Sequence, residues 1–119
     1  MTSDPVCIDA GEPVQAALAL MNDESIRHLP VMHENRLVGV ISDRDIAQAL
    51  AVSSRPTLIV EEAMTPNPYS VLPENVFSDV LRVMAANRLG CVIVKDGGEN
   101  IVGIFTSTDA VRLLADLVD

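Results

Sequence analysis

The sequence predicts an α+β fold made of two tandem βαββα units that pack about a pseudo-twofold axis. Three observations lead to this prediction. An internal repeat spans nearly the whole chain, both repeats place strand-like and helix-like segments in the same order, and a single unit would leave an apolar face exposed. Two packed units bury that face, which gives the duplication a physical reason.

The repeat follows two fixed offsets. Residues 1–5 match residues 64–68 at an offset of 63, and this offset continues from Ile8 to Met21. One inserted residue then moves the offset to 64, at which residues 37–42 match residues 101–106. We therefore expect a single module over the chain, with these approximate bounds: repeat one over residues 1–56, and the linker with repeat two over residues 57–119.

Each repeat is expected to begin with a short extended segment and an amphipathic helix. The extended segments are residues 5–8 and 69–72. Pro13 suits the first turn of the first helix, where its missing N–H costs no hydrogen bond. Apolar residues recur at helical spacing in both helices: Val14, Ala17, Leu18 and Met21 in repeat one, and Val76, Phe77, Val80, Leu81 and Met84 in repeat two.

Two strands and a closing helix complete each repeat, so that each unit has a three-stranded sheet and two helices. The connector at residues 96–99 contains the Asp-Gly-Gly typical of a tight turn. Residues 53–56 end the first closing helix, and residues 61–64 are expected to form a helical turn. The expected elements are strands at 29–32, 37–42, 91–95 and 101–106, and closing helices at 43–52 and 107–117.

Composition excludes several classes of protein. Apolar residues make up 49% of the chain, which argues against disorder. A net charge of −9 argues against a nucleic-acid binder, which needs a basic surface. No apolar run approaches the roughly 20 residues of a membrane helix, and no signal peptide is recognisable. We therefore expect a cytoplasmic location. Cys7 and Cys91 fit neither a disulfide framework nor a metal motif.

A Gly-x-x-(Ser/Thr)-x-x-Asp motif recurs where the last strand of each repeat meets the closing helix. Its polar residues are Ser42 and Asp45 in repeat one and Thr106 and Asp109 in repeat two. The same spacing is that of a capping box, in which these residues stabilise the helix by about 0.5–2 kcal/mol per cap. Periodicity alone does not separate a helix cap from a binding site.

The sequence resembles a tandem pair of cystathionine-β-synthase (CBS) domains, also called a Bateman module. The resemblance covers the whole chain and rests on the repeated Met-Thr-x-x-Pro opening, on residues 27–31 (Arg-His-Leu-Pro-Val) and on the two motifs. It implies a regulatory module with clefts between paired sheets that bind an adenosine-containing ligand: AMP, ADP, ATP, NAD or S-adenosylmethionine, with or without Mg²⁺. It also implies a homodimer and an output protein or domain of unknown identity.

The resemblance assigns roles to residues by position. Asp45 and Asp109 would hold the ribose hydroxyls through charge-assisted hydrogen bonds, and the adjacent helix N-termini would favour phosphate oxygens. The opening segment of the opposite repeat would contact the base, so residues 65–70 would face Asp45 and residues 2–7 would face Asp109. The implied ligand-binding residues are Thr2, Pro5, Arg27, His28, Ser42, Arg44, Asp45, Thr65, Pro68, Thr106, Ser107, Thr108 and Asp109.

The two repeats differ in their basic residues. Repeat one carries Arg27, His28 and Arg44, whereas repeat two has Gly90 and Thr108 at the positions of the two arginines. We therefore expect repeat one to bind phosphate better, and repeat two to bind a less charged adenosyl group or nothing. The alternative is that the arginines are solvated surface charges, paired with a nearby acid, and that His28 only ends a strand.

The sequence favours a binding module over an enzyme. No Ser/His/Asp order, Cys/His pair, zinc spacing or phosphate-binding glycine loop is present. Two alternatives to a nucleotide sensor stay open. One is a ligand-free dimerisation or scaffold module in which Asp45 and Asp109 are caps only. The other is a divalent-cation sensor, because the acidic residues at 43, 45, 61 and 62 suit Mg²⁺.

Overall fold

A computed structural model describes residues 2–3, 5–55, 57–98 and 100–118. Met1, Asp4, Pro56 and Glu99, which entered the repeat, linker and turn assignments above, lie outside these residues. The chain divides into two compact units, one of residues 6–68 and one of residues 1–5 with 69–119. Both units mix helices with a β-sheet, so the α+β class expected from the sequence is confirmed.

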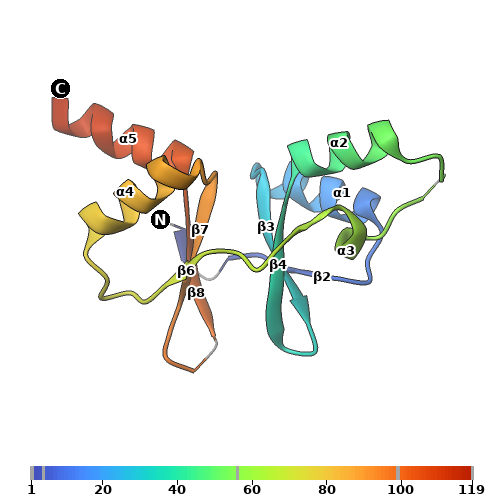
Figure 1. The fold of residues 1–119 in the computed structure, drawn as a ribbon, viewed down its shortest axis with the longest axis horizontal. Helices are drawn as coiled ribbons and strands as arrows, with labels where there is room; N and C mark the ends of the chain where they lie inside the picture. The colour runs from blue at the N-terminus through green and yellow to red at the C-terminus, as the bar shows by residue number, and fades with distance from the viewer. Residues whose placement is uncertain (1, 4, 56, 99, 119) are drawn as a thin grey trace. The chain divides into compact units, whose positions relative to one another are not determined.

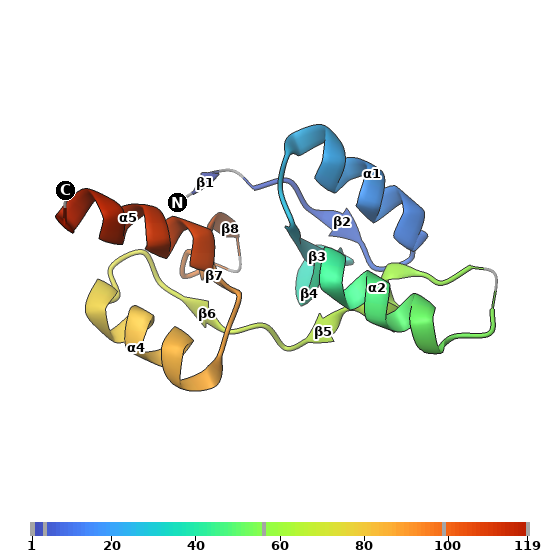
Figure 2. The same cartoon turned by 90° about the horizontal axis from the view of Figure 1, so that it is seen from above.

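The first unit, residues 6–68, is a four-stranded sheet in the order β2-β3-β4-β5 (Figure 2). β3 pairs parallel with β2 and antiparallel with β4, which pairs antiparallel with β5. Figure 1 shows α1, α2 and α3 on one side of the β3–β4 hairpin. Its elements are β2 (Ile8–Asp9), α1 (Val14–Glu24), β3 (His28–His33), β4 (Arg36–Ser42), α2 (Asp43–Val52), α3 (Val60–Ala63) and β5 (Thr65–Pro66).

The second unit repeats this plan with strands in the order β1-β8-β7-β6 (Figure 2). β6 and β7 pair parallel, and β7 and β8 form the antiparallel hairpin. α4 and α5 lie beside this hairpin (Figure 1). Its elements are β1 (Thr2–Ser3), β6 (Ser70–Val71), α4 (Phe77–Asn87), β7 (Cys91–Lys95), β8 (Ile101–Thr106) and α5 (Ser107–Val118).

The expectation of three strands per unit is wrong, because each sheet gains a fourth strand from the other repeat. Thr65 and Pro66, which open repeat two, pair with Val40 and Gly39 of β4. Residues 2–3, which open repeat one, pair with β8 at the equivalent register. The backbone N–H and C=O groups at the edge of a three-stranded hairpin sheet find partners in this way. The two compact units therefore differ from the two sequence repeats.

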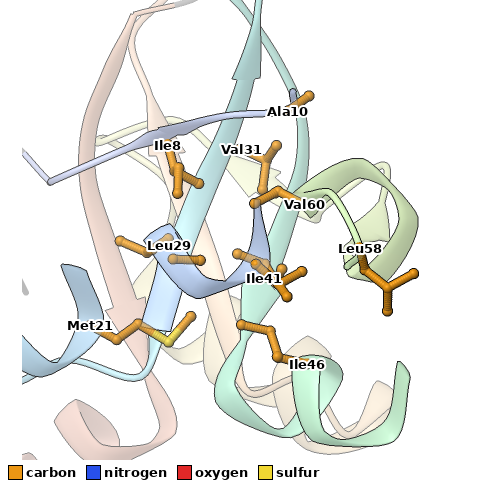
Figure 3. Close-up of a cluster of buried hydrophobic side chains, with 11 residues drawn as sticks. Ile8, Ala10, Met21, Leu29, Val31, Ile41, Ile46, Leu58 and Val60 are labelled. Atoms are coloured by element: carbon orange, nitrogen blue, oxygen red, sulfur yellow. The ribbon is translucent and has the colours of Figure 1, made fainter. Parts of the chain in front are cut away.

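The core of the first unit lies between its sheet and its helices. Leu29, Val31 and Ile41 of the sheet belong to one cluster with Ile46 of α2, and Figure 3 shows Ile41 next to Ile46. Leu58 and Val60, from the segment that contains α3, enter the same cluster and are 5% and 0% exposed. Burial of a side chain of this size contributes about 1.5–3 kcal/mol. The linker between the repeats is thus part of this core.

The second unit has a smaller core, built on Val80, Met84, Val92 and Phe105. Two sequence expectations for its first helix are wrong. Val76 precedes α4 and is 61% exposed, and Phe77 is 46% exposed. In repeat one, Leu18 is also exposed, and Pro13 lies one residue before the first helical residue rather than within the first turn. The helical spacing of apolar residues predicted both helices, but it did not show which of these residues are buried by the rest of the unit.

Candidate functional site

The motif of the first unit places Ser42 at the end of β4 and Asp45 in the first turn of α2. The backbone N–H of Asp45 donates to Ser42 Oγ at 3.1 Å, and the Ser42 N–H donates to Asp45 Oδ2 at 3.0 Å. This is a complete capping box. Asp45 Oδ1 accepts no hydrogen bond from any residue that the structure describes. The cap thus uses one carboxylate oxygen and fixes the direction of the other.

Strand register gathers the predicted residues of this unit on one face of the sheet. His28 lies directly opposite Ser42, and Thr65 lies directly opposite Val40. Because Val40 and Ser42 are two residues apart on β4, all four side chains project to the same face. The opposite face carries Ile41 and packs against the helices. The candidate site therefore lies on the sheet face that turns away from the helices.

Arg27 and Arg44 lie next in sequence to His28 and Asp45, and neither has an anionic partner among the described residues. Arg27 precedes β3, Arg44 lies in the first turn of α2, and both are exposed. Neither forms an ion pair with a residue that the structure describes. The sequence left open a pairing of these arginines with a neighbouring acid, and no such pair occurs among the described residues. Both groups can take up a phosphate without first losing a carboxylate.

Burial and the nearby carboxylates have opposite effects on the pKa of His28. Desolvation by burial lowers the pKa of its imidazole. The carboxylates of Asp43 and Asp45 act in the opposite direction, and Arg27 adds to the lowering. Burial is the largest of these effects, so the neutral imidazole is favoured. The neutral ring offers one N–H donor and one nitrogen acceptor to a bound molecule.

The N-terminal N–H groups of α2 are already occupied by the chain itself. The N–H of Asp43 donates to the Arg27 carbonyl at 3.2 Å, and that of Arg44 donates to Asp43 Oδ1 at 2.8 Å. The Asp45 N–H is taken by Ser42 Oγ. A phosphate placed here would have to displace the Asp43 carboxylate to reach an N–H group. The arginines, more than the helix N-terminus, suit this site to an anion.

The second unit repeats the geometry with fewer charges. The Thr106 N–H donates to Asp109 Oδ2 at 2.9 Å, and the Asp109 N–H donates to Thr106 Oγ1 at 3.2 Å. Cys91 is paired opposite Thr106, where the first unit has His28. The N–H of Ser107 donates to the Gly90 carbonyl at 2.9 Å. Within the part of the chain that the structure describes, the exposed Thr108 has no hydrogen-bond partner for its N–H.

The opening segments reach the expected sheets only in part. Residues 65–68, with Thr65 and Pro68, belong to the unit that holds Asp45, and residues 2–5, with Thr2 and Pro5, belong to the unit that holds Asp109. The register places Thr2 opposite Ile104, and its side chain lies outside the described residues.

The remaining residues of those segments belong to the other compact unit in each case. Residues 69–70 and 6–7 lie in the unit of their own repeat, because β6 pairs with β7 and residue 8 begins β2.

Val40 and its equivalent Ile104 are site residues that the sequence reasoning missed. Each lies two residues before the motif hydroxyl and opposite an opening-segment threonine. The two-residue period counted back from Ser42 would have identified both. They add an apolar surface to a site that otherwise consists of hydroxyl, carboxylate and basic groups. Such a combination suits a ligand with a flat apolar base and a polar sugar.

Residues 1–52 and 60–116 match the family model described as CBS domain. The chain belongs to the CBS domain family. It is 31% identical over 114 residues to L-aspartate semialdehyde sulfurtransferase of Methanocaldococcus jannaschii, a match over 95% of this chain and 22% of the relative. The chain thus spans less than a quarter of the length of that relative.

Solved CBS structures share the fold. The CBS domain pair of protein MJ0100, in complex with 5'-methylthioadenosine and S-adenosyl-L-methionine, has a TM-score of 0.89 and 30% identity, covering 98% of this chain and 93% of that one. CBSX2 in complex with AMP has a TM-score of 0.80 and 26% identity, covering 100% and 95%. The resemblance found in the sequence is therefore confirmed, and relatives of this chain bind adenosine-containing molecules.

The described residues offer neither a cluster of metal-binding side chains nor a membrane-spanning helix. No group of three or more His, Cys, Asp or Glu side chains in the described part of the chain is placed to hold a metal ion. None of the helices described there combines the length and the apolar character needed to cross a lipid bilayer.

Proposed function

We propose that this CBS chain is a regulatory module that binds an adenosine-containing ligand, with its principal site at the β4–α2 junction of the first unit. The observation that carries the proposal is the Asp45 carboxylate, which the capping box holds by one oxygen while Oδ1 stays available. An ionised carboxylate is a strong acceptor for ribose O–H groups. The adenosine ligands of the solved relatives support this assignment.

The two sites are proposed to differ in ligand charge. Arg27 and Arg44 give the first site two guanidinium groups without ion-pair partners among the described residues, which suits a phosphate-bearing ligand such as AMP, ADP, ATP or NAD. The second site has Gly90 and Thr108 at these positions. It suits an adenosyl group with little negative charge, such as S-adenosylmethionine.

The chain is proposed to act through a partner rather than to catalyse a reaction. A bound ligand biases a switch only by its different affinity for the two states of the module. The whole chain serves as one module in this proposal and pairs with a second copy, and an output protein or domain reads its state. Sedimentation measurements that show only monomer at all concentrations would contradict the pairing.

The test is a thermal-unfolding panel with AMP, ADP, ATP, NAD and S-adenosylmethionine, each with and without Mg²⁺. A ligand at 100 times its Kd stabilises the folded state by about 2.7 kcal/mol. The variants are Asp45→Asn and its matched control Asp109→Asn. Because an asparagine oxygen can still accept the Ser42 N–H, Asp45→Asn should cost less than about 1 kcal/mol of stability.

Each outcome of the panel decides between functions. A shift with one ligand that Asp45→Asn abolishes and Asp109→Asn keeps would support the proposed site. A full shift retained in Asp45→Asn would reduce Asp45 to a helix cap and contradict the site. No shift with any adenosyl ligand would favour the scaffold function, and a shift with Mg²⁺ alone would favour a cation sensor.

A further inference from the structure

His28 lies on the sheet face that carries the proposed ligand site of the first unit. It is paired directly opposite Ser42, and its side chain projects to the same face as those of Val40 and Thr65. The imidazole is partly buried. Among the described residues the ring forms no hydrogen bond, and no side-chain nitrogen that lacks a partner is buried. Both ring nitrogens are therefore accessible, and a bound molecule can reach them.

The charged groups around the imidazole include both of the proposed ligand anchors. Burial has the largest effect and lowers the pKa of His28, the carboxylates of Asp43 and Asp45 raise it, and Arg27 lowers it. In the proposed site, Asp45 holds the ribose and Arg27 attracts a phosphate. His28 is thus within electrostatic reach of both ends of such a ligand. The side chains that β4 and β5 place on this face carry no charge: Val40, Ser42 and Thr65.

A bound phosphate changes the balance of these effects. Without a ligand, burial keeps the imidazole neutral above about pH 6.5. A phosphate that binds to Arg27 brings a negative charge close to the ring and offsets the effect of the arginine. Because an opposite charge favours the charged form of a titrating group, the phosphate raises the pKa of His28. Proton uptake and ligand binding then strengthen each other by the same factor.

The second unit has no counterpart of this group. Cys91 takes the equivalent position opposite Thr106, and the two histidines of the chain, His28 and His33, both belong to the first unit. A thiol becomes negatively charged when it titrates, so it cannot add a positive charge beside a phosphate. An effect of this kind is therefore confined to the first site.

We propose that His28 makes the first site bind phosphate-bearing adenosine ligands more tightly as the pH falls below neutrality, so that the site responds to protons as well as to the nucleotide. The inference rests on the proposed function, because it requires a phosphate bound near Arg27 while Asp45 holds the ribose. A ligand without phosphate brings no negative charge to the imidazole, and its affinity should not rise in this way.

The test compares the Kd of NAD at about pH 7.5 and about pH 5.5 by isothermal titration calorimetry. NAD is the probe because its diphosphate does not titrate in this range, whereas the terminal phosphates of AMP and ATP do. Adenosine is the matched ligand without phosphate, and it reports any effect of pH on the ribose and base contacts. Every protein in the test carries Asp109→Asn, which removes the proposed ribose acceptor of the second site.

Two histidine variants isolate the titrating group. His28→Gln removes the ionisation and keeps a side chain that donates and accepts hydrogen bonds. The matched control is His33→Gln, because His33 is exposed at the other end of β3, beside Glu34. NMR of the imidazole C–H signals measures the pKa of each histidine directly, in the free protein and with NAD.

NAD should bind about three- to tenfold more tightly at the lower pH, while the Kd of adenosine should change by less than about twofold. In His28→Gln the pH dependence for NAD should fall to that for adenosine, and His33→Gln should retain the full effect. The pKa of His28 should rise by about 1 when NAD binds, and that of His33 should stay the same.

Three results would overturn this inference and leave the proposed function intact: an NAD affinity that does not depend on pH, a pH dependence that survives in His28→Gln, and an equal dependence for adenosine. In each case a ligand still binds. An absence of NAD binding at both pH values would instead contradict the phosphate-binding character proposed for the first site, and this inference with it.

Discussion

Gly39 offers a sharp test of how the fourth strand is held against β4. A Cβ atom added at this position would lie 2.5 Å from Met64 Sδ, 3.1 Å from Met64 Cγ and 2.8 Å from the backbone oxygen of Thr65. The flexible Met64 side chain can move away. The Thr65 carbonyl belongs to β5, which pairs with β4 at this point, so Gly39→Ala requires the strand itself to shift.

Two opposing effects set the size of the change. Alanine reduces the entropy of the unfolded chain and on that account stabilises by about 0.4–1 kcal/mol. Overpacking against a backbone atom costs about 1–3 kcal/mol and outweighs that gain. For a unit of this size, Tm should fall by roughly 4–8 °C for each kcal/mol of net loss. The affinity of the first site should fall as well, because Thr65 moves with β5.

The assay is urea and thermal unfolding of Gly39→Ala beside Gly97→Ala. A Cβ at Gly97 meets nothing within 4 Å, so this control should be as stable as the wild type or slightly more stable. The double variant Gly39→Ala/Met64→Ala separates the two clashes. Wild-type stability in Gly39→Ala, with amide shifts of β5 unchanged, would refute the reasoning, because the strand would then have room for the methyl group.

Three further predictions concern the first unit. Because burial lowers the pKa of His28 below its ordinary value of about 6.5, the unfolded chain binds more protons just below that pH. The free energy of unfolding should therefore reach its full value above about pH 6.5 and fall as the pH drops below this value. In urea unfolding, the free energy of unfolding of His28→Gln should depend less on pH in this range. Leu58→Ala should cost about 2–5 kcal/mol in chemical denaturation, whereas its 37%-exposed neighbour Ile59→Ala should cost less than about 1 kcal/mol. Arg44→Ala should weaken ATP about 10- to 100-fold by calorimetry, from the loss of a charged hydrogen bond, and leave S-adenosylmethionine almost unaffected; equal losses for both ligands would contradict a phosphate role.

The long strands and helices were predictable because each carries a complete period of apolar residues. The fourth strand of each sheet was not, because β1 and β5 have two residues each and show no alternation. Pro66 also disfavours a strand in sequence reasoning, although an edge position tolerates its missing N–H. The exposure of Phe77 was not predictable either, because helical spacing identifies an apolar stripe without showing which residues cover it.

The motif residues of the site were predictable, and their surroundings were not. Ser42 and Asp45 lie together because a capping box is a local structure with its own spacing. The approach of Thr65 depends on a pairing between residues 25 positions apart along the chain, Val40 and Thr65. Val40 resembles an ordinary core residue in the sequence. Counting back two residues from Ser42 would have placed it on the face of Ser42, but only the register of β5 shows that Thr65 lies opposite it.

The exchange of opening strands has a consequence for synthesis on the ribosome. Everything that the first unit needs has been translated once residue 68 has emerged, since its sheet closes with β5. The second sheet closes on Thr2 and Ser3, which pair with Ile104 and Gly103. Thr2 and Ser3 therefore stay without these strand partners until residues 103 and 104 have been synthesised. A nascent chain stalled after residue 68 would contain every strand of the first sheet, while Thr2 and Ser3 would still lack their partners in β8.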